Sequence, residues 1–206
     1  MKGNLIIISS PSGGGKGTLI KRVLNSVSDI GYSVSWTTRA PRSGEENLKD
    51  YCFVSKGEFE RHRSEGGFLE YAEVHGNLYG TSKKQIEQIT SDGRDIILEI
   101  DVQGAQAVME QVPNAVSIFI LPPSFETLRA RLIARATEGS DDLAVRLRNS
   151  HFEVAQYSRF KYVVINDEVN SAADRLVSVI IAERQQKNRQ MDAIQGILDS
   201  FERSKS

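Results

Sequence analysis

The sequence has a single cysteine and lacks any long apolar run. Cys52 has no partner for an intrachain disulfide, so a reducing, cytoplasmic location is predicted. The first apolar run, LIII at 5–8, is too short for the hydrophobic segment of a signal peptide, and Lys2 is the only basic residue before it. No segment approaches the roughly 20 apolar residues that a membrane span needs. A membrane is therefore not an expected partner.

A strong charge of either sign is also absent. The formal net charge of the 206 residues is −1, so nucleic acid is not an expected partner either. The histidines (His62, His75 and His151) show no metal-ligand spacing, which favours structural or surface roles. Hydrophobic residues make up 39% and charged residues 26%, as in ordinary globular proteins. This length and composition predict one well-cored domain with small inserted lobes.

The order of elements predicts an α/β fold. Short continuous apolar runs are typical of buried parallel strands, and residues at helical spacing lie between them. The predicted strands are 4–9, 96–100, 116–121 and 162–166. One predicted helix begins at about Lys16, and the others cover 103–111, 124–136, 141–157 and 171–190. This alternation predicts a parallel sheet that is covered on both faces.

Three segments depart from the alternation. Residues 33–81 contain short strands and one helix near 56–66, which predicts a lobe inserted into the core. Residues 135–146, RATEGSDDLAVR, form a polar turn between Arg-bearing helices, as mobile lids often do. The tail 191–201 has apolar residues at helical spacing, so we expect it to pack on the core or on a second subunit.

Residues 10–18, SPSGGGKGT, indicate a phosphate-binding loop, because they connect a predicted strand to a predicted helix. Small residues let successive N–H groups turn towards an anion, and Lys16 can bridge the β- and γ-phosphates. Two positions depart from the pattern G-x-x-x-x-G-K-[ST]: Ser10 replaces the first glycine, and Gly17 replaces the hydroxyl residue after the lysine. A glycine-rich turn without a ligand is the alternative.

The departure at Gly17 bears on Mg²⁺, because the residue after the lysine normally gives its hydroxyl to the metal. Thr18, one place on, is better placed for a phosphate oxygen. We therefore expect no direct protein ligand. Mg²⁺ is carried by the nucleotide phosphates and by waters that are oriented by Asp101, at the end of the strand 96–100.

The segment TTRAPR at 37–42 indicates a second phosphate site. Arg39 and Arg42 lie three residues apart in an extended loop, and two guanidinium groups suit a doubly charged phosphate.

Over nearly its full length the chain resembles the guanylate kinase family, with matching segments in the family's order. They are SPSGGGKGT at 10–18, SVSWTTRAPRSGE at 33–45, DYCFV at 50–54, FLEYAEVHGNLYGTS at 68–82, ILEIDVQGA at 97–105, IFILPPS at 118–124, RLIARATE at 131–138 and VVINDE at 163–168. The resemblance implies transfer of the γ-phosphoryl group of ATP to GMP or dGMP, in purine nucleotide metabolism and GMP recycling.

The resemblance also implies an architecture: a P-loop NTPase-type parallel sheet flanked by helices, with an inserted mixed α/β GMP-binding lobe and a small helical lid. The implied division of the single domain 1–206 is a core at 1–32, 83–124 and 158–206, a lobe at 33–82 and a lid at 125–157. The implied partners are ATP with Mg²⁺ and GMP, and both a monomer and a homo-oligomer are compatible with the sequence.

The resemblance implies three sets of site residues and no protein nucleophile. For GMP they are Ser35, Arg39, Arg42, Tyr51, Glu70, Tyr79, Thr81 and Asp101. For ATP they are Ser12, Gly13, Gly14, Gly15, Lys16, Gly17, Thr18 and Asn166. For catalysis they are Lys16, Arg131, Arg135 and Arg146, while Arg148 is left as a solvated helix residue. Glu99 stands where the family usually has Asp, and its longer side chain argues against a direct role.

Other functions stay open at this point. The sequence Lys16-Gly17-Thr18 also resembles the end of the adenylate kinase loop, which suggests another small-molecule kinase of the same fold. A guanylate-kinase-like module that binds phosphopeptides without catalysis is an alternative from a different class. Phosphorylation of a sugar phosphate is a third, although Glu70 would then lack a purine partner.

Overall fold

The structure is a computed structural model that describes residues 2–42, 44–74, 76–135 and 140–205. Its central sheet contains β1 (Leu5–Ser9), β2 (Ile30–Tyr32), β7 (Asp95–Glu99), β8 (Val116–Leu121) and β9 (Tyr162–Ile165). The strand order is β2-β7-β1-β8-β9, and every pair is parallel. The predicted parallel α/β fold is confirmed, and β1 lies at the centre of the sheet.

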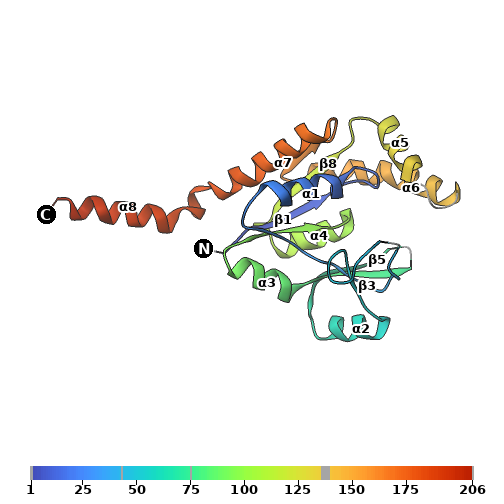
Figure 1. The fold of residues 1–206 in the computed structure, drawn as a ribbon, viewed down its shortest axis with the longest axis horizontal. Coiled ribbons are helices and arrows are strands. Elements are labelled where there is room, and N and C mark those ends of the chain that lie inside the picture. The colour runs from blue at the N-terminus through green and yellow to red at the C-terminus, as the bar shows by residue number, and fades with distance from the viewer. Residues whose placement is uncertain (1, 43, 75, 136–139, 206) are drawn as a thin grey trace.

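Helices cover both faces of this sheet (Figure 1). Ile6 and Ile8 of β1 belong to one buried cluster, which includes residues of α1 (Lys16–Ser26) and α7 (Val169–Arg184). Ile7 points to the opposite face and its cluster, with residues of α4 (Val102–Gln111) and α3 (Lys83–Ser91). Because strand side chains alternate, β1 is buried on both faces, and each fully buried isoleucine contributes about 1.5–3 kcal/mol.

A second sheet lies wholly within residues 33–82. It contains β3 (Trp36–Thr37), β4 (Cys52–Phe53), β5 (Phe68–Val74) and β6 (Asn77–Ser82), in the order β4-β3-β6-β5 and with mixed directions. Helix α2 (Lys56–Ser64) begins at a capping box made by Ser55 and Glu58. The His62 ring stacks on Trp36 with centroids 4.4 Å apart, so this histidine has a packing role.

Two helices follow β8 in the chain: α5 (Phe125–Arg135) and α6 (Ser140–Ala155). The 3₁₀ turn η1 (Gln156–Arg159) continues α6. The predicted lid turn includes residues 136–139, which lie outside the described residues. The division of the chain into core, lobe and lid as functional units stays a prediction.

The structure corrects some element predictions. Strand β2 and helix α3 were not predicted, because β2 has three residues and α3 places only Ile86 and Ile89 against the core. The helix predicted over 171–190 ends as α7 at Arg184. Residues 185–190, QQKNRQ, have no apolar side chain to pack, and the Gln190 side chain donates to the Arg184 carbonyl at 2.9 Å. A 3₁₀ turn, η2 (Lys187–Arg189), follows.

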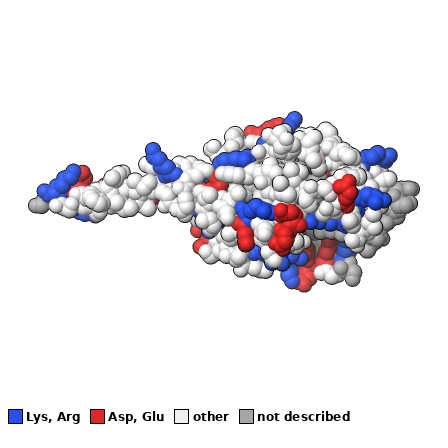
Figure 2. Space-filling model, turned by 90° about the horizontal axis from the view of Figure 1, so that it is seen from above, with Lys and Arg blue, Asp and Glu red and all other residues white. Residues whose placement is uncertain are grey.

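The C-terminal helix α8 (Met191–Arg203) projects away from the body of the molecule (Figure 1). The expectation that it packs on the core is wrong: none of its residues is buried, and Phe201 is 66% exposed. Figure 2 shows the arm from above, with charged side chains at its tip and mostly uncharged surface behind them. Packing on a second subunit stays a prediction. No helix in the described part of the chain has the length and apolar composition to cross a bilayer.

Candidate active site

The loop between β1 and α1 is wound tightly by its glycines. Gly13 and Gly15 have φ angles of 82° and 87°, in the left-handed region that favours glycine. A β-carbon on Gly14 would lie 2.8 Å from the Ser10 β-carbon, so the chain passes too close there for any side chain. The Gly14 N–H donates to the Pro11 carbonyl at 2.9 Å. Ser10 is therefore accommodated at the start of a loop that curls around the N-terminus of α1, as a phosphate cradle requires.

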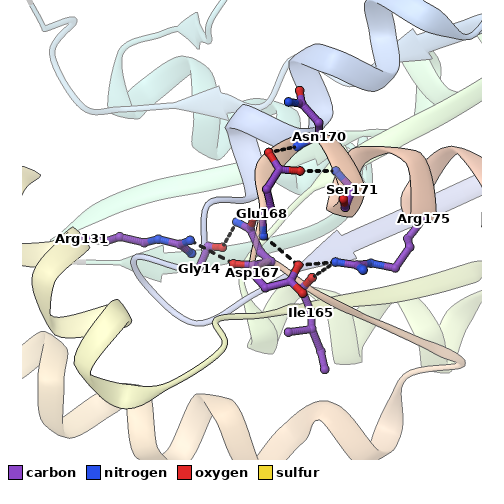
Figure 3. Close-up of polar contacts among 9 residues, drawn as sticks. Gly14, Arg131, Ile165, Asp167, Glu168, Asn170, Ser171 and Arg175 are labelled. Carbon is purple, nitrogen blue, oxygen red and sulfur yellow. Dashed lines mark hydrogen bonds and ion pairs between the residues drawn. The ribbon is translucent and has the colours of Figure 1, made fainter.

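Residues distant in the sequence brace the outside of this loop. The buried Asn166 follows β9, and its Nδ2 donates to the Gly14 carbonyl at 2.8 Å. The Arg131 Nη2 of α5 donates in turn to the Asn166 carbonyl at 3.0 Å. Figure 3 shows Arg131 and Gly14 near each other, each with a dashed line to the residue that bridges them. On α6, the Glu153 carboxylate accepts from the Ser12 N–H at 3.0 Å. The loop is thus held by both helices of the predicted lid and by the end of β9.

The segment after Asn166 is itself fixed. The Glu168 carboxylate accepts from the N–H groups of Asn170 and Ser171, which caps the N-terminus of α7. Asp167 forms an ion pair with Arg175 (Figure 3). Asn166 therefore lies between two anchored elements. Its predicted contact with ATP stays a prediction, and in this structure its side chain braces the loop.

The structure describes the side chains of two predicted catalytic arginines, Arg131 and Arg146, but not that of Arg135. The Arg131 Nη1 is buried near Gly15 and makes no hydrogen bond within the described part of the chain, so this donor is available to a ligand. Arg146 is half-buried on α6. Arg135 ends α5, and its side chain lies outside the described part. Arg148 is exposed, as predicted.

Lys16 begins α1 and reaches into a cavity of about 230 Å³. Its Nζ lies 4.0 Å from Oε1 of Glu99, a residue to which sequence reasoning assigned no role. The Tyr32 hydroxyl donates to the other carboxylate oxygen at 3.1 Å. Burial, together with the Glu99 charge, raises the pKa of Tyr32 above its ordinary range, so this hydroxyl stays protonated. Thr18, two residues after Lys16, is exposed.

The same cavity extends from Lys16 to the second sheet. The predicted site residues that line it are Lys16, Ser35, Tyr51, Glu70, Tyr79 and Asp101. Thr81 lies behind Glu70 and donates to its carboxylate at 2.5 Å. The structure thus brings together, in one cavity, a lysine from the phosphate loop and residues from a lobe that is far away in sequence.

Burial gives Glu70 unusual acid–base properties. The residue is 8% exposed, and desolvation raises the pKa of its carboxyl group to about 7, while the Thr81 hydrogen bond opposes the rise and the Asp101 charge adds to it. A β-carbon on Gly104 would lie 2.9 Å from the Glu70 carboxylate, so the glycine makes room for this side chain. A buried carboxylate with unused acceptor capacity is suited to a ligand that brings adjacent N–H donors.

The predicted phosphate arginines lie on the loop before β4. Both Glu45 oxygens accept from the Arg39 Nη2, at 2.9 and 3.0 Å, and this pairing lowers the pKa of Glu45 below its ordinary value. The Arg39 guanidinium lies 5.3 Å from the centroid of the Tyr51 ring. The Arg42 side chain is exposed, and its backbone N–H donates to Glu45 at 2.7 Å. Glu45 was missed from the sequence, although it lies in the quoted segment SVSWTTRAPRSGE.

Asp101 lies at the carboxyl end of β7, as predicted, but one of its oxygens has a structural partner. The Asp101 Oδ1 accepts from the Gly104 N–H at 2.8 Å and caps α4. Its side chain therefore lies on the Glu70 side of the cavity. The predicted role in orienting waters around Mg²⁺ stays a prediction.

A glycine loop at the carboxyl edge of a parallel sheet, with a lysine at the first turn of the next helix, defines the P-loop class of nucleotide-binding proteins. A protein-family model described as guanylate kinase matches residues 2–183. The chain belongs to the guanylate kinase family.

Relatives and a solved structure agree with this assignment. The chain is 46% identical to a guanylate kinase of Neisseria gonorrhoeae over 199 residues, 97% of each protein. It is also 46% identical to a guanylate kinase of Clostridium tetani over 193 residues, 94% of this chain and 92% of that protein. The crystal structure of guanylate kinase from Anaplasma phagocytophilum superposes with a TM-score of 0.76 at 38% identity, covering 91% of this chain and 89% of that one.

Proposed function

We propose that this protein catalyses transfer of the γ-phosphoryl group of ATP to GMP, giving ADP and GDP. The observation that carries the proposal is the shared cavity: Lys16 of the phosphate loop and the buried Glu70 of the inserted sheet line the same space. An ATP phosphate bound at Lys16 and a guanine bound at Glu70 would therefore lie in the same cavity. Membership of the family supports this activity.

On the donor side, the loop 10–18 binds the ATP phosphates through its N–H groups and Lys16. The Arg131 Nη1 lies beside Gly15 and has no partner within the described residues, which supports a role in neutralising the charge that develops on the transferred group. Arg135 and Arg146 are proposed for the same role from the lid. No protein nucleophile is needed, because a GMP phosphate oxygen attacks the γ-phosphorus directly, and positioning provides most of the catalysis.

On the acceptor side, Glu70 reads the guanine through N1–H and the 2-amino group, with Ser35 and Thr81 beside it. The guanidinium groups of Arg39 and Arg42 hold the GMP phosphate. The hydroxyls of the two tyrosines of this pocket, Tyr51 and Tyr79, complete the phosphate site; their rings lie 6.0 Å apart. Leaving the buried Glu70 without its donors is what would reject adenine, by up to roughly 10⁴-fold.

The residues present fit Mg²⁺ carried by the nucleotide. The cavity beside Lys16 offers carboxylate oxygens, which are the ligands that Mg²⁺ prefers, and Gly17 leaves open the space that a side chain would fill. When bound, the ion neutralises phosphate charge. Waters oriented by Asp101, just beyond β7, would complete its coordination. Closure of the predicted lid 125–157 would exclude water from the reaction.

A coupled assay that compares GMP with AMP tests the proposal. We expect rapid ADP formation with GMP and almost none with AMP. Lys16→Met should abolish kcat with GMP binding nearly intact, whereas Lys21→Met, an exposed lysine on the same helix, should leave both unchanged. A preference for AMP would favour an adenylate kinase. Absence of turnover with every nucleotide, and no effect of Lys16→Met, would favour a phosphopeptide-binding module.

A further inference from the structure

A second cavity, of about 480 Å³, lies at the amino-terminal edge of the central sheet. Its wall includes Lys2 and Asn4 at the start of β1, residues 113–115 before β8 and Lys161 before β9. Because these strands are parallel, their first residues share the edge opposite to the phosphate loop, which follows the end of β1. The end of α7 and the turn η2 complete the wall. This cavity is therefore separate from the one beside Lys16.

The wall contains a buried amide that the fold does not use. Asn4 is 3% exposed, and its backbone is fixed: its N–H donates to Oδ1 of Asp95 at 2.6 Å, and its carbonyl accepts from the Ile96 N–H at 2.9 Å. The Asn4 side chain lines the cavity and makes no hydrogen bond within the described part of the chain. Since buried amides are normally hydrogen-bonded, this one is suited to a ligand that enters the cavity.

The charges of the wall are mainly positive. Lys2, Lys161 and Arg189 line the cavity, and Glu183 is the acid among the lining residues. Glu183 is 4% exposed and accepts from the Lys161 Nζ at 2.7 Å and from the Tyr162 hydroxyl at 2.5 Å. The carboxylate thus holds Lys161 in place, and its own charge is compensated. The wall as a whole favours an anion.

The segment before β1 is held by the turn that follows α7. The Arg189 Nη1 donates to the Lys2 carbonyl at 2.6 Å, and the Gly3 N–H donates to the Thr90 carbonyl at 2.9 Å. The Lys2 ammonium itself is exposed and makes no ion pair with the residues that the structure describes. Its backbone is therefore anchored at the cavity, while its charge is available to a ligand.

The chemistry of the wall suits phosphate groups. None of the described residues that line it has an aromatic ring on which a nucleobase could stack. Besides the cations and Asn4, the wall carries the amide side chains of Asn114, Gln186 and Asn188. These are more donors than a single carboxylate accepts, whereas phosphate groups carry several acceptor oxygens and suit guanidinium and ammonium groups.

We propose that this cavity binds a small phosphate-bearing anion, outside the ATP and GMP sites. The Asn4 amide, the Lys2 ammonium and the remaining donors of Arg189 bind its oxygens. The simplest probe of this class is inorganic pyrophosphate.

Isothermal titration calorimetry with pyrophosphate tests the site. The protein is first saturated with GMP and a non-hydrolysable ATP analogue, so that pyrophosphate cannot occupy the phosphate loop. Mg²⁺ is omitted because pyrophosphate sequesters it. We expect one binding event per chain, with a Kd below about 1 mM. Asn4→Leu and Lys2→Met should each weaken it at least about fivefold. Lys187→Met, an exposed lysine of η2 outside the cavity wall, is the matched control and should bind as the wild type does.

Thermal denaturation separates ligand binding by Asn4 from a structural role. Without pyrophosphate, Asn4→Leu should be at least as stable as the wild type, because the lost amide has no partner in the described fold. Pyrophosphate should raise the melting temperature of the wild type, and raise that of Asn4→Leu less. If Asn4→Leu does not fold, Lys2→Met still decides, because this exposed side chain makes no ion pair within the described residues.

Three results would overturn the inference. The first is no pyrophosphate binding up to about 10 mM while the nucleotide sites are occupied. The second is binding that neither Lys2→Met nor Asn4→Leu weakens, which would place the anion elsewhere. The third is tighter binding of citrate than of pyrophosphate, measured in the same way, which would make this a carboxylate site.

Discussion

Lowering the pH from about 8 to about 6 should weaken GMP binding through protonation of Glu70. The carboxyl group has a pKa of about 7 in the folded protein because it is buried, and the Asp101 charge adds to the rise. Only the ionised form accepts hydrogen bonds at both oxygens from guanine N1–H and the 2-amino group. Protonation replaces one acceptor with a donor, which then opposes a guanine donor.

The size of the effect follows from the ionised fraction. With a pKa of about 7, roughly nine tenths of the Glu70 carboxyl is ionised at pH of about 8 and roughly one tenth at pH of about 6. If only the ionised form binds, the dissociation constant of GMP should rise roughly tenfold over this range, equivalent to about 1.4 kcal/mol. ATP-analogue binding should lack this component, because its site does not include Glu70.

Isothermal titration calorimetry with GMP alone measures the effect. The GMP phosphate itself gains a proton near pH ~6, which also weakens binding. Glu70→Gln keeps this phosphate effect and removes the carboxyl titration. The ratio of the Gln variant's dissociation constant to that of the wild type should therefore fall roughly tenfold from pH of about 8 to about 6. A ratio that stays constant would refute the assignment of Glu70 to guanine.

The remaining predictions concern stability and the two phosphate sites. The folded pKa of Glu70 lies above its ordinary value of 4.5, so the ionised carboxylate destabilises the protein above pH of about 7 and not below about 4.5. Glu70→Gln should raise the unfolding free energy at pH of about 8 by up to about 3 kcal/mol, measured by urea denaturation. Arg39→Ala and Arg42→Ala should raise the KM for GMP about 10- to 100-fold with less effect on kcat, and unchanged GMP kinetics would contradict their placement. Glu153→Ala should raise the KM for ATP about fivefold by leaving the Ser12 N–H without its acceptor, whereas Glu153→Gln should retain ATP binding.

The core of the fold could be predicted because its signal is local. The predicted strands at 4–9 and 116–121 correspond to β1 and β8, since strands buried on both faces leave continuous apolar runs. The apolar run at 162–166 predicted β9, although Val163 and Ile165 are exposed. Strand β2 has only three residues and leaves no such pattern. The spacing in the tail predicted the helix α8 but not what covers its apolar face, because an amphipathic pattern does not specify a partner.

The candidate site, like the fold, could be predicted only in part. Its residue types and their order could be predicted, because the matching segments are contiguous in the sequence. The contacts that position these residues could not be predicted. Ser12 meets Glu153 across 141 residues of sequence, and Asn166 meets Gly14 across 152. Glu153 carries no signal of its own in the sequence, since a glutamate on a helix is usually solvated.

Gly17 and Glu99 show what three-dimensional proximity adds to motif reading. In the sequence alone, Gly17 lacks the hydroxyl that the loop pattern has, and Glu99 is longer than the aspartate usual in the family. Each residue then appears to weaken the site. In the fold, β1 leads into the loop and β7 pairs with β1, which brings the two positions to within one side chain's length of each other. The Glu99 carboxylate then lies at van der Waals distance from the space that a side chain at 17 would fill.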